Sequence, residues 1–195
     1  FGNRGKYKYR AKPNDDPAYI TAKPSAETYQ RLKLYLLFQF TIPGNPHIWN
    51  GEEMGMWGAD DPDCRKPLWW PEMNFEPERI SNISPLVTGY DTVGFNQEMY
   101  DYYKLLTSLR KKCKSLATTD ISFVLAEGKK MIYLRGAQNE KVLVAFNLSE
   151  EAMTYTIPRS EKKTVLFGDE ACLSGDEIII EPLQAVAVQL EGGFD

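Results

Sequence analysis

The sequence is poor in the side chains that most often bind metals or form disulfides. Its 195 residues include one histidine, His47, and three cysteines, Cys64, Cys113 and Cys172. The cysteines are widely spaced, without a Cys-x-x-Cys motif, and three thiols leave at least one unpaired within the chain. The sequence therefore predicts neither a disulfide framework nor a zinc site, and it assigns no metal-binding residue.

Long apolar runs and an excess of positive charge are also missing. No apolar run approaches the roughly 20 residues that a membrane-spanning helix needs. The formal net charge is −4, which argues against broad nucleic-acid binding because such binding needs a strongly basic face. The stretch Arg4–Lys12 alternates basic residues with tyrosines, but it is short and is interpreted as a solvated loop. The hydrophobic content of 43% is enough for a buried core.

Two segments have the pattern of helices. Ser25 is a suitable N-cap for a helix that runs to about Thr41 and is apolar on most sides, so we expect it to be buried on most sides. The second helix opens at Asn96, which can cap it, while Phe95 can pack against Tyr100 as a hydrophobic staple. Its apolar face continues to about residue 116, with lysines near the negative end of the helix dipole.

The chain between these helices begins with helix breakers and continues as a long loop. Pro43-Gly44 ends the first helix, and Pro46–Asn50 is too short for a helix, so we expect a buried strand there. Residues 51–95 contain five prolines and form a loop region. Loops of this length in compact domains are usually functional.

The last third of the chain has the pattern of an all-β domain. Short β-rich runs alternate with turn-like clusters, and their regular spacing predicts an antiparallel sandwich. The predicted strands are Ile121–Ala126, Met131–Arg135, Lys141–Asn147, Ala152–Ile157, Thr164–Phe167, Ile178–Glu181 and Ala185–Leu190.

Two sequence runs carry a resemblance to a known family. Pro43–Met56 has the pattern Pro-Gly-x-Pro-x-Ile-(aromatic)-x-Gly-Glu-Glu-x-Gly-Met, and Asp60–Pro67 contains Asp-Pro-Asp-Cys-Arg-(basic)-Pro. The first resembles the last barrel strand of the α-amylase family of glycoside hydrolases. The second resembles the loop after that strand in the neopullulanase-like, maltodextrin-acting and α-glucosidase branches.

The resemblance implies an α+β fragment with two parts. Residues 1–117 would be the last helix-strand-helix part of a β/α TIM barrel, with polar groups placed at the C-terminal mouth of a strand. Residues 118–195 would be the antiparallel β-sandwich that follows the barrel as a C-terminal domain.

The implied function is the retaining hydrolysis of α-glucosidic bonds in starch and maltooligosaccharides. In the family the nucleophile Asp, the acid/base Glu and the stabilising Asp follow the fourth, fifth and seventh strands. No such triad precedes Pro43, and no Asn-His-Asp motif is present. The chain is therefore expected to be a C-terminal portion that contains no catalytic residue and is inactive alone. No cofactor is assigned, and the calcium use of a complete enzyme is left open.

Asp61 and Arg65 are the first candidates for substrate binding. A carboxylate and a guanidinium four residues apart on a turn can meet, and both can then bind vicinal sugar hydroxyls. In the neopullulanase-like branch, an Asp and an Arg at the matching positions contact glucose beyond the scissile ring. The alternative is an ion pair that only stabilises the loop, and both interpretations stay open here.

The tryptophans of the same loop and the carboxylates before it complete the candidate set. Trp57 and Trp69 are predicted sugar contacts, because aromatic faces suit the C–H faces of sugar rings, although packing over the barrel end is the alternative. Glu52 and its neighbour Glu53 are mainly expected to fix the loop by hydrogen bonding, with Glu52 retained as a residue that lines the sugar cleft. Lys66 is interpreted as solvated.

Other functions and partners follow from the same residues. The predicted partner is an α-glucan oligosaccharide, bound by the complete barrel, and the alternatives are a non-catalytic carbohydrate-binding module and a purely structural one. The first helix would leave an apolar face exposed in this chain, which predicts self-association or contact with a partner. That face consists of Leu32, Leu36, Phe38 and Phe40.

Overall fold

The computed structural model describes residues 15–16, 19–61, 64–80, 89–136 and 140–192. Two compact units divide the chain, and each is built from two separate stretches. The first unit combines Phe1–Tyr29 with Ile48–Tyr103, and the second combines Gln30–His47 with Lys104–Asp195. The division runs through both helices, whereas the sequence predicted a boundary after residue 117. The second unit therefore contains the β-rich part together with the C-terminal parts of both helices.

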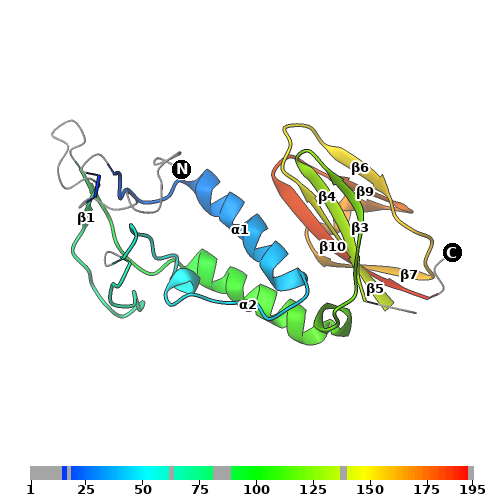
Figure 1. The fold of residues 1–195 in the computed structure, drawn as a ribbon, viewed down its shortest axis with the longest axis horizontal. Helices are drawn as coiled ribbons and strands as arrows, with labels where there is room; N and C mark the ends of the chain where they lie inside the picture. The colour runs from blue at the N-terminus through cyan, green and yellow to red at the C-terminus, as the bar shows by residue number, and fades with distance from the viewer. Residues whose placement is uncertain (1–14, 17–18, 62–63, 81–88, 137–139, 193–195) are drawn as a thin grey trace. The chain divides into compact units, whose positions relative to one another are not determined.

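Both predicted helices are confirmed. Helix α1 spans Ala26–Thr41, and the Ser25 hydroxyl accepts a hydrogen bond from the Thr28 amide at 3.2 Å, as an N-cap does (Figure 1). No helix among the described residues is both long and apolar enough to cross a bilayer.

Helix α2 spans Gln97–Lys112 and begins as its sequence predicted. The Asn96 side-chain oxygen accepts a hydrogen bond from the Met99 amide at 3.1 Å. The rings of Phe95 and Tyr100 lie 5.2 Å apart between centroids, which is the predicted staple. Capping groups act locally, and this is why the start of the helix could be recognised from sequence.

The strand predicted at Pro46–Asn50 is wrong in this structure. Residues 45–49 have no regular secondary structure, and Ile48 and Trp49 are 45% and 58% exposed. A strand needs a hydrogen-bonded neighbour, and no strand of the described residues pairs with this segment. The chain then turns through a short 3₁₀ helix, η2, at Glu52–Met54.

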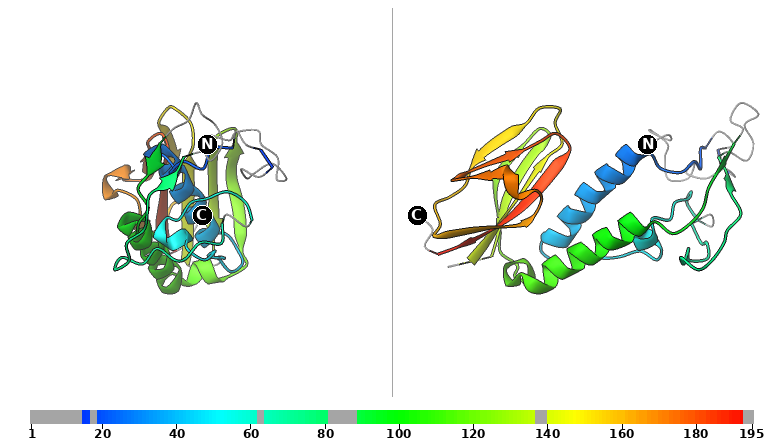
Figure 2. Two further views of the ribbon diagram at one scale, coloured as in Figure 1. Left: turned by 90° about the vertical axis from the view of Figure 1, so that its left-hand side faces the viewer. Right: turned by 180° about the vertical axis from the view of Figure 1, so that it is seen from behind.

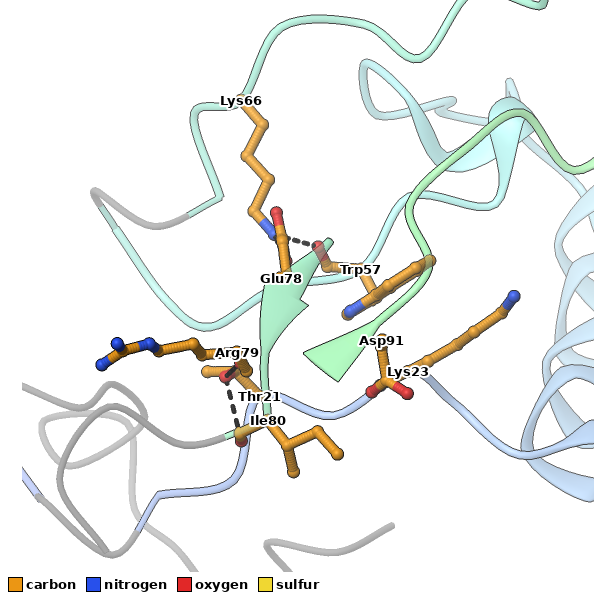
Figure 3. Close-up of polar contacts among 8 residues, drawn as sticks. All are labelled: Thr21, Lys23, Trp57, Lys66, Glu78, Arg79, Ile80 and Asp91. Carbon is orange, nitrogen blue, oxygen red and sulfur yellow. Dashed lines mark hydrogen bonds and ion pairs between the residues drawn. The ribbon is translucent and has the colours of Figure 1, made fainter. Parts of the chain in front are cut away.

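The long loop contains a small ribbon that the sequence did not reveal. Strands β1 (Glu78–Arg79) and β2 (Tyr90–Asp91) pair antiparallel. The Thr21 hydroxyl donates to the Arg79 carbonyl at 3.0 Å, and the Lys23 amide donates to an Asp91 carboxylate oxygen at 2.6 Å (Figure 3). The segment before α1 is therefore attached to the ribbon by side-chain bonds on both of its strands.

The predicted all-β part is confirmed as two antiparallel sheets around one core (Figure 2). The five-stranded sheet has the order β3-β4-β5-β10-β7, and the three-stranded sheet has the order β6-β9-β8. The larger sheet consists of β3 (Ile121–Glu127), β4 (Lys130–Arg135), β5 (Glu140–Asn147), β10 (Gln184–Glu191) and β7 (Lys162–Phe167). The smaller sheet consists of β6 (Met153–Thr156), β9 (Glu177–Ile180) and β8 (Leu173–Ser174). A 3₁₀ helix precedes β3 (η3, Lys114–Ala117), and another precedes β8 (η4, Glu170–Cys172).

Both faces of β5, the central strand of the five-stranded sheet, are buried. Leu143 and Ala145 of β5 belong to the core between the sheets, while Val142, Val144 and Phe146 on the opposite face are also buried. A strand that is buried on both faces reads as a continuous apolar run instead of an alternating one. This explains why β5 has the sequence Val-Leu-Val-Ala-Phe before Asn147.

The C-terminal part of α1 packs on the outer face of this sheet. The Phe38 ring contacts the rings of Tyr133 and Phe146, each with centroids 6.3 Å apart, and the Thr41 and Tyr133 hydroxyls are hydrogen-bonded at 2.6 Å. Leu36 is 1% exposed. Leu36 and Phe40 of the predicted apolar face are therefore buried and Phe38 packs on the sheet, which corrects the premise that this face is exposed. Self-association of the chain stays a prediction.

Candidate functional site

Glu52 and Glu53 fold back on the turn that carries them. A Glu52 carboxylate oxygen accepts from the Trp49 amide at 3.2 Å and from the Tyr103 hydroxyl at 3.3 Å. A Glu53 carboxylate oxygen accepts from the Gly51 amide at 3.1 Å. Burial, followed by the Glu52 charge, raises the pKa of Tyr103, because both effects disfavour a phenolate. These contacts show the two carboxylates fixing the turn, while Glu52 remains exposed on one side.

Asp61 and Arg65 meet, as their spacing predicted. The Arg65 guanidinium Nε donates to an Asp61 carboxylate oxygen across four residues. The side chains are 76% and 55% exposed for Arg65 and Asp61, so solvent screens the pair and it contributes little to stability. An exposed, oriented carboxylate–guanidinium pair presents donors and acceptors side by side, which is the geometry that vicinal hydroxyls match.

The two predicted tryptophans have different environments. Trp69 is 1% exposed and packs against Trp57 and Phe75, with ring centroids 4.5 and 6.4 Å apart. Its burial counts against a sugar contact, so Trp69 is assigned a packing role. Trp57 is half-buried and receives the edge-on packing of Trp69 on one side. Trp70 of the same loop is 44% exposed, and Trp49 before the loop is 58% exposed.

Trp57 also lines a polar cavity of about 260 Å³. The cavity lies beside the N-terminal end of α2, and Tyr29 donates from its hydroxyl to the Gly55 carbonyl at its wall, at 2.8 Å. Burial raises the pKa of Tyr29, so its hydroxyl stays protonated. The Trp57 indole N–H is buried without a hydrogen-bond partner among the described residues. The Lys23 ammonium lies 5.6 Å from the Trp57 ring centroid.

Lys66 is not the solvated lysine that the sequence suggested. Its ammonium donates to the Glu78 carboxylate at 2.5 Å and to the Trp57 carbonyl at 2.9 Å (Figure 3). The side chains of Lys66 and Glu78 are only 19% and 29% exposed. No pattern in the sequence pairs these two residues, because the partner is twelve residues away on a strand that forms only in the folded loop.

The described residues offer no evident metal centre. No group of three or more His, Cys, Asp or Glu side chains in the described part of the chain is arranged to hold an ion. The three cysteines are free thiols, of which Cys113 is buried, and burial raises the pKa of its thiol. Asp63, the neighbour of the candidate loop residues, lies outside the described residues.

The chain is similar in sequence to known proteins. The chain is 33% identical over 147 residues to a cyclomaltodextrinase of Geobacillus thermopakistaniensis, covering 74% of this chain and 21% of that protein. It is 32% identical over 169 residues to neopullulanase 2 of Thermoactinomyces vulgaris, covering 85% of this chain and 24% of that protein. No protein-family model matches the chain. The predicted resemblance to the α-amylase family is confirmed.

A solved structure agrees with this assignment at the level of the fold. The type III pullulan hydrolase from Thermococcus kodakarensis aligns with a TM-score of 0.64 over 90% of this chain and 26% of its own, at 22% identity. Such a low identity shows a similar fold and no more. The chain spans less than a quarter of the length of this cyclomaltodextrinase and of this neopullulanase. What those complete proteins do can therefore only be proposed for this chain.

Proposed function

We propose that this chain is the C-terminal portion of an α-glucan-acting glycoside hydrolase. The observation that carries the proposal is the exposed Asp61–Arg65 pair, which forms in a chain similar to a cyclomaltodextrinase and a neopullulanase. The substrate class is starch-derived oligosaccharides with α-glucosidic linkages. Retention of configuration would require a nucleophile and an acid/base carboxyl about 5–5.5 Å apart, and neither is assigned within these residues.

The proposal includes the barrel as the origin of the first 117 residues. Helix α1, the extended segment 46–50 and helix α2 have the chain order of the last helix-strand-helix part of a β/α barrel. Residues 118–195 would be the accessory β-sandwich.

In this proposal the chain binds and orients the glucan while the bond cleavage occurs elsewhere. The Arg65 guanidinium donates to the hydroxyls of one glucose, and the Asp61 carboxylate accepts from the neighbouring hydroxyl. Trp57 supplies an apolar face beside them. Charge-assisted hydrogen bonds of this kind fix the register of an oligosaccharide in the cleft.

The direct test measures oligosaccharide binding by the 195-residue chain. Isothermal titration with maltotriose is compared with cellotriose, whose linkages are β. We expect the chain to bind maltotriose more tightly than cellotriose. Asp61→Ala and Arg65→Ala should each raise the Kd for maltotriose about tenfold or more, because each removes a charge-assisted hydrogen bond.

A second exposed ion pair provides the matched control. Lys129 and Glu150 lie 3.8 Å apart with side chains 64% and 94% exposed, so Glu150→Ala removes a similar pair elsewhere in the chain. This variant is expected to bind maltotriose as the unaltered chain does. Equal binding of both trisaccharides, or equal losses in all three variants, would contradict the proposed site.

A further inference from the structure

The loop that carries Asp61 and Arg65 is closed by a single side chain, Lys66. Its ammonium connects the Trp57 carbonyl at the start of the loop to the Glu78 carboxylate on β1 at its end (Figure 3). It also lies 5.7 Å from the centroid of the buried Trp69 ring. One side chain thus contacts three separate points of the loop.

The burial of this connection separates it from the neighbouring ion pair. Lys66 and Glu78 are shielded from solvent, at 19% and 29% side-chain exposure, whereas Arg65 keeps 76% of its side-chain surface exposed. A screened surface pair does little to order a loop. A shielded ammonium that satisfies a carboxylate and a carbonyl together leaves both uncompensated if it is removed. The order of the loop should therefore depend on Lys66 rather than on the exposed pair.

We propose that Lys66 is a positioning residue for oligosaccharide binding, which acts by holding Trp57 and by fixing the loop from which the adjacent Arg65 projects. This inference rests on the proposed function. Lys66 makes no contact with sugar in this scheme, because its donors point to Trp57 and Glu78. Its contribution is preorganisation: a loop already held in the binding geometry loses less conformational freedom when the ligand arrives.

The test compares two substitutions at Lys66 in the 195-residue chain. Lys66→Met keeps the length of the side chain and removes its donors and charge, while Lys66→Arg can still donate to a carbonyl and a carboxylate together. We expect Lys66→Met to weaken maltotriose binding about fivefold or more, and Lys66→Arg to restore most of it, since the cost is one of lost preorganisation.

A half-buried lysine in the β-rich part serves as the matched control. Lys163, with a side chain 15% exposed, pairs with Asp176 at 2.6 Å. Lys163→Met therefore removes a comparable ion pair far along the sequence from the candidate loop. It is expected to leave maltotriose binding unchanged even if it lowers the melting temperature, so a general loss of stability is separated from a loss of positioning.

A ¹⁹F NMR signal can report the environment of the Trp57 side chain in the ligand-free protein. The chain is labelled with 5-fluorotryptophan, and the ¹⁹F signal of Trp57 is assigned with Trp57→Phe. Lys66→Met should shift or broaden this signal in the ligand-free protein, and Lys163→Met should not. Binding that is unchanged in Lys66→Met, or an unmoved Trp57 signal, would overturn the inference.

The two proposals fail in different ways. If the unaltered chain binds no maltotriose, the proposed glucan site is wrong for this chain, and the role of Lys66 in binding falls with it. The ligand-free ¹⁹F signal then still decides whether Lys66 holds Trp57. If the unaltered chain binds maltotriose and Lys66→Met binds it equally well, the site stands and only the positioning role is wrong.

Discussion

Asn147 shows how far one buried polar side chain can determine the packing of a sandwich. It is fully buried, and its amide donates to the carbonyls of Glu151 and Ile180 at 2.7 and 2.9 Å. Its side-chain oxygen accepts from the Ser149 amide and hydroxyl. Because Asn147 belongs to β5 and Ile180 to β9, one amide links the five-stranded sheet to the three-stranded sheet. All the capacity of the side chain is used, which makes a buried amide tolerable.

We predict that Asn147→Ala lowers the free energy of unfolding by about 2–4 kcal/mol, because two carbonyls and one amide lose their partner in a buried place. Urea unfolding followed by far-UV circular dichroism measures the change. Asn74→Ala at an exposed position is the control and should change stability by less than about 0.5 kcal/mol. A loss no larger than that of the control would mean that the sheets are held together without this amide.

Within the described ranges, Asp176 is the carboxyl group whose pKa shift gives a pH prediction. The hydrogen bond from Lys163, and then its charge, lower the pKa of Asp176 below its ordinary value of 3.8. At acidic pH the folded chain therefore binds fewer protons at this site than the unfolded chain does. The contribution of the pair is complete above about pH 4 and is lost as the pH falls through the lowered pKa.

Carboxyl ¹³C titration by NMR should find a lower pKa for Asp176 in the unaltered chain than in Lys163→Met. In that variant the pKa should return toward the ordinary value, because the donor and the charge are both gone. An identical titration in both proteins would show that the pair does not persist in solution.

The exposed Asp61–Arg65 pair leads to a prediction about substrate length. In a complete enzyme that contains this chain, Asp61→Ala and Arg65→Ala should impair oligosaccharide cleavage more than cleavage of a short aryl glucoside. Each lost charge-assisted hydrogen bond would cost about 1.5–3 kcal/mol of transition-state binding, since only the longer substrate reaches these residues. The ratio of kcat/KM values for the two substrates measures this. Equal losses on both would favour the interpretation that the pair only stabilises its loop.

At the scale of secondary-structure elements, two arginines on α2 and β4 hold the C-terminal end of α1 by hydrogen bonds to its carbonyls. The Arg110 guanidinium of α2 donates to the carbonyl of Phe40, which lies in the last turn of α1 and has no partner within the helix, and to the carbonyls of Ile42 and Gly44 just after the helix. Arg135 of β4 is fully buried and donates to the Thr41 carbonyl. Burial, followed by the charge of Arg110, lowers the pKa of Arg135. Cationic side chains at a helix C-terminus are also favoured by the helix dipole.

Arg135 has further partners that explain why it can be buried. It donates from Nε to the Asp120 carbonyl at 2.8 Å, and its terminal nitrogens reach the carbonyls of Leu116 and Thr118 at 3.2 and 2.5 Å. These carbonyls lie in and after η3, at the start of β3. A single guanidinium therefore joins the end of α1 to the beginning of the β-rich part, within the second unit.

We predict that Arg135→Met destabilises the chain by about 3–5 kcal/mol, because several buried carbonyls lose their donor. Limited proteolysis provides the structural readout. In the unaltered chain, the segment 30–42 should resist cleavage together with the strands, whereas in Arg135→Met it should be cut first. Lys130→Met, on the same strand but only half-buried, is the control. Equal protection in both variants would show that apolar packing alone holds the helix.

At the scale of the whole molecule, the paired carboxylates Glu52 and Glu53 have the structural role that the sequence predicted. Glu52 and Glu53 lie on the short 3₁₀ helix η2, and their carboxylates accept hydrogen bonds from the backbone of their own turn. They do not form the facing pair of carboxyls that a retaining glycosidase needs. In the proposed function this turn therefore supports the substrate-binding loop and supplies no catalytic carboxyl.

We predict that the 195-residue chain does not hydrolyse starch, maltooligosaccharides or pullulan. Reducing-sugar release should stay at the level of a blank without protein after prolonged incubation. Reproducible release that Glu52→Gln or Glu53→Gln abolishes would place the catalytic residues inside the chain and overturn the proposed division of roles.

Local signals in the sequence determined the helices, most strands and the family. Ser25 and Asn96 act within one turn of their own helix, and the apolar runs of the β-rich part are short patterns with adjacent turns, so both could be predicted from neighbouring residues. The spacing of Asp61 and Arg65 is likewise local, and the pair forms. Tertiary structure alone decided the rest, because each case depends on a partner distant in sequence. Segment 46–50 pairs with no strand in the described part of the chain, and Trp69 is covered by other aromatic side chains of its loop. Lys66 pairs with Glu78, and the C-terminal part of α1 packs on a sheet contributed by residues about a hundred positions later.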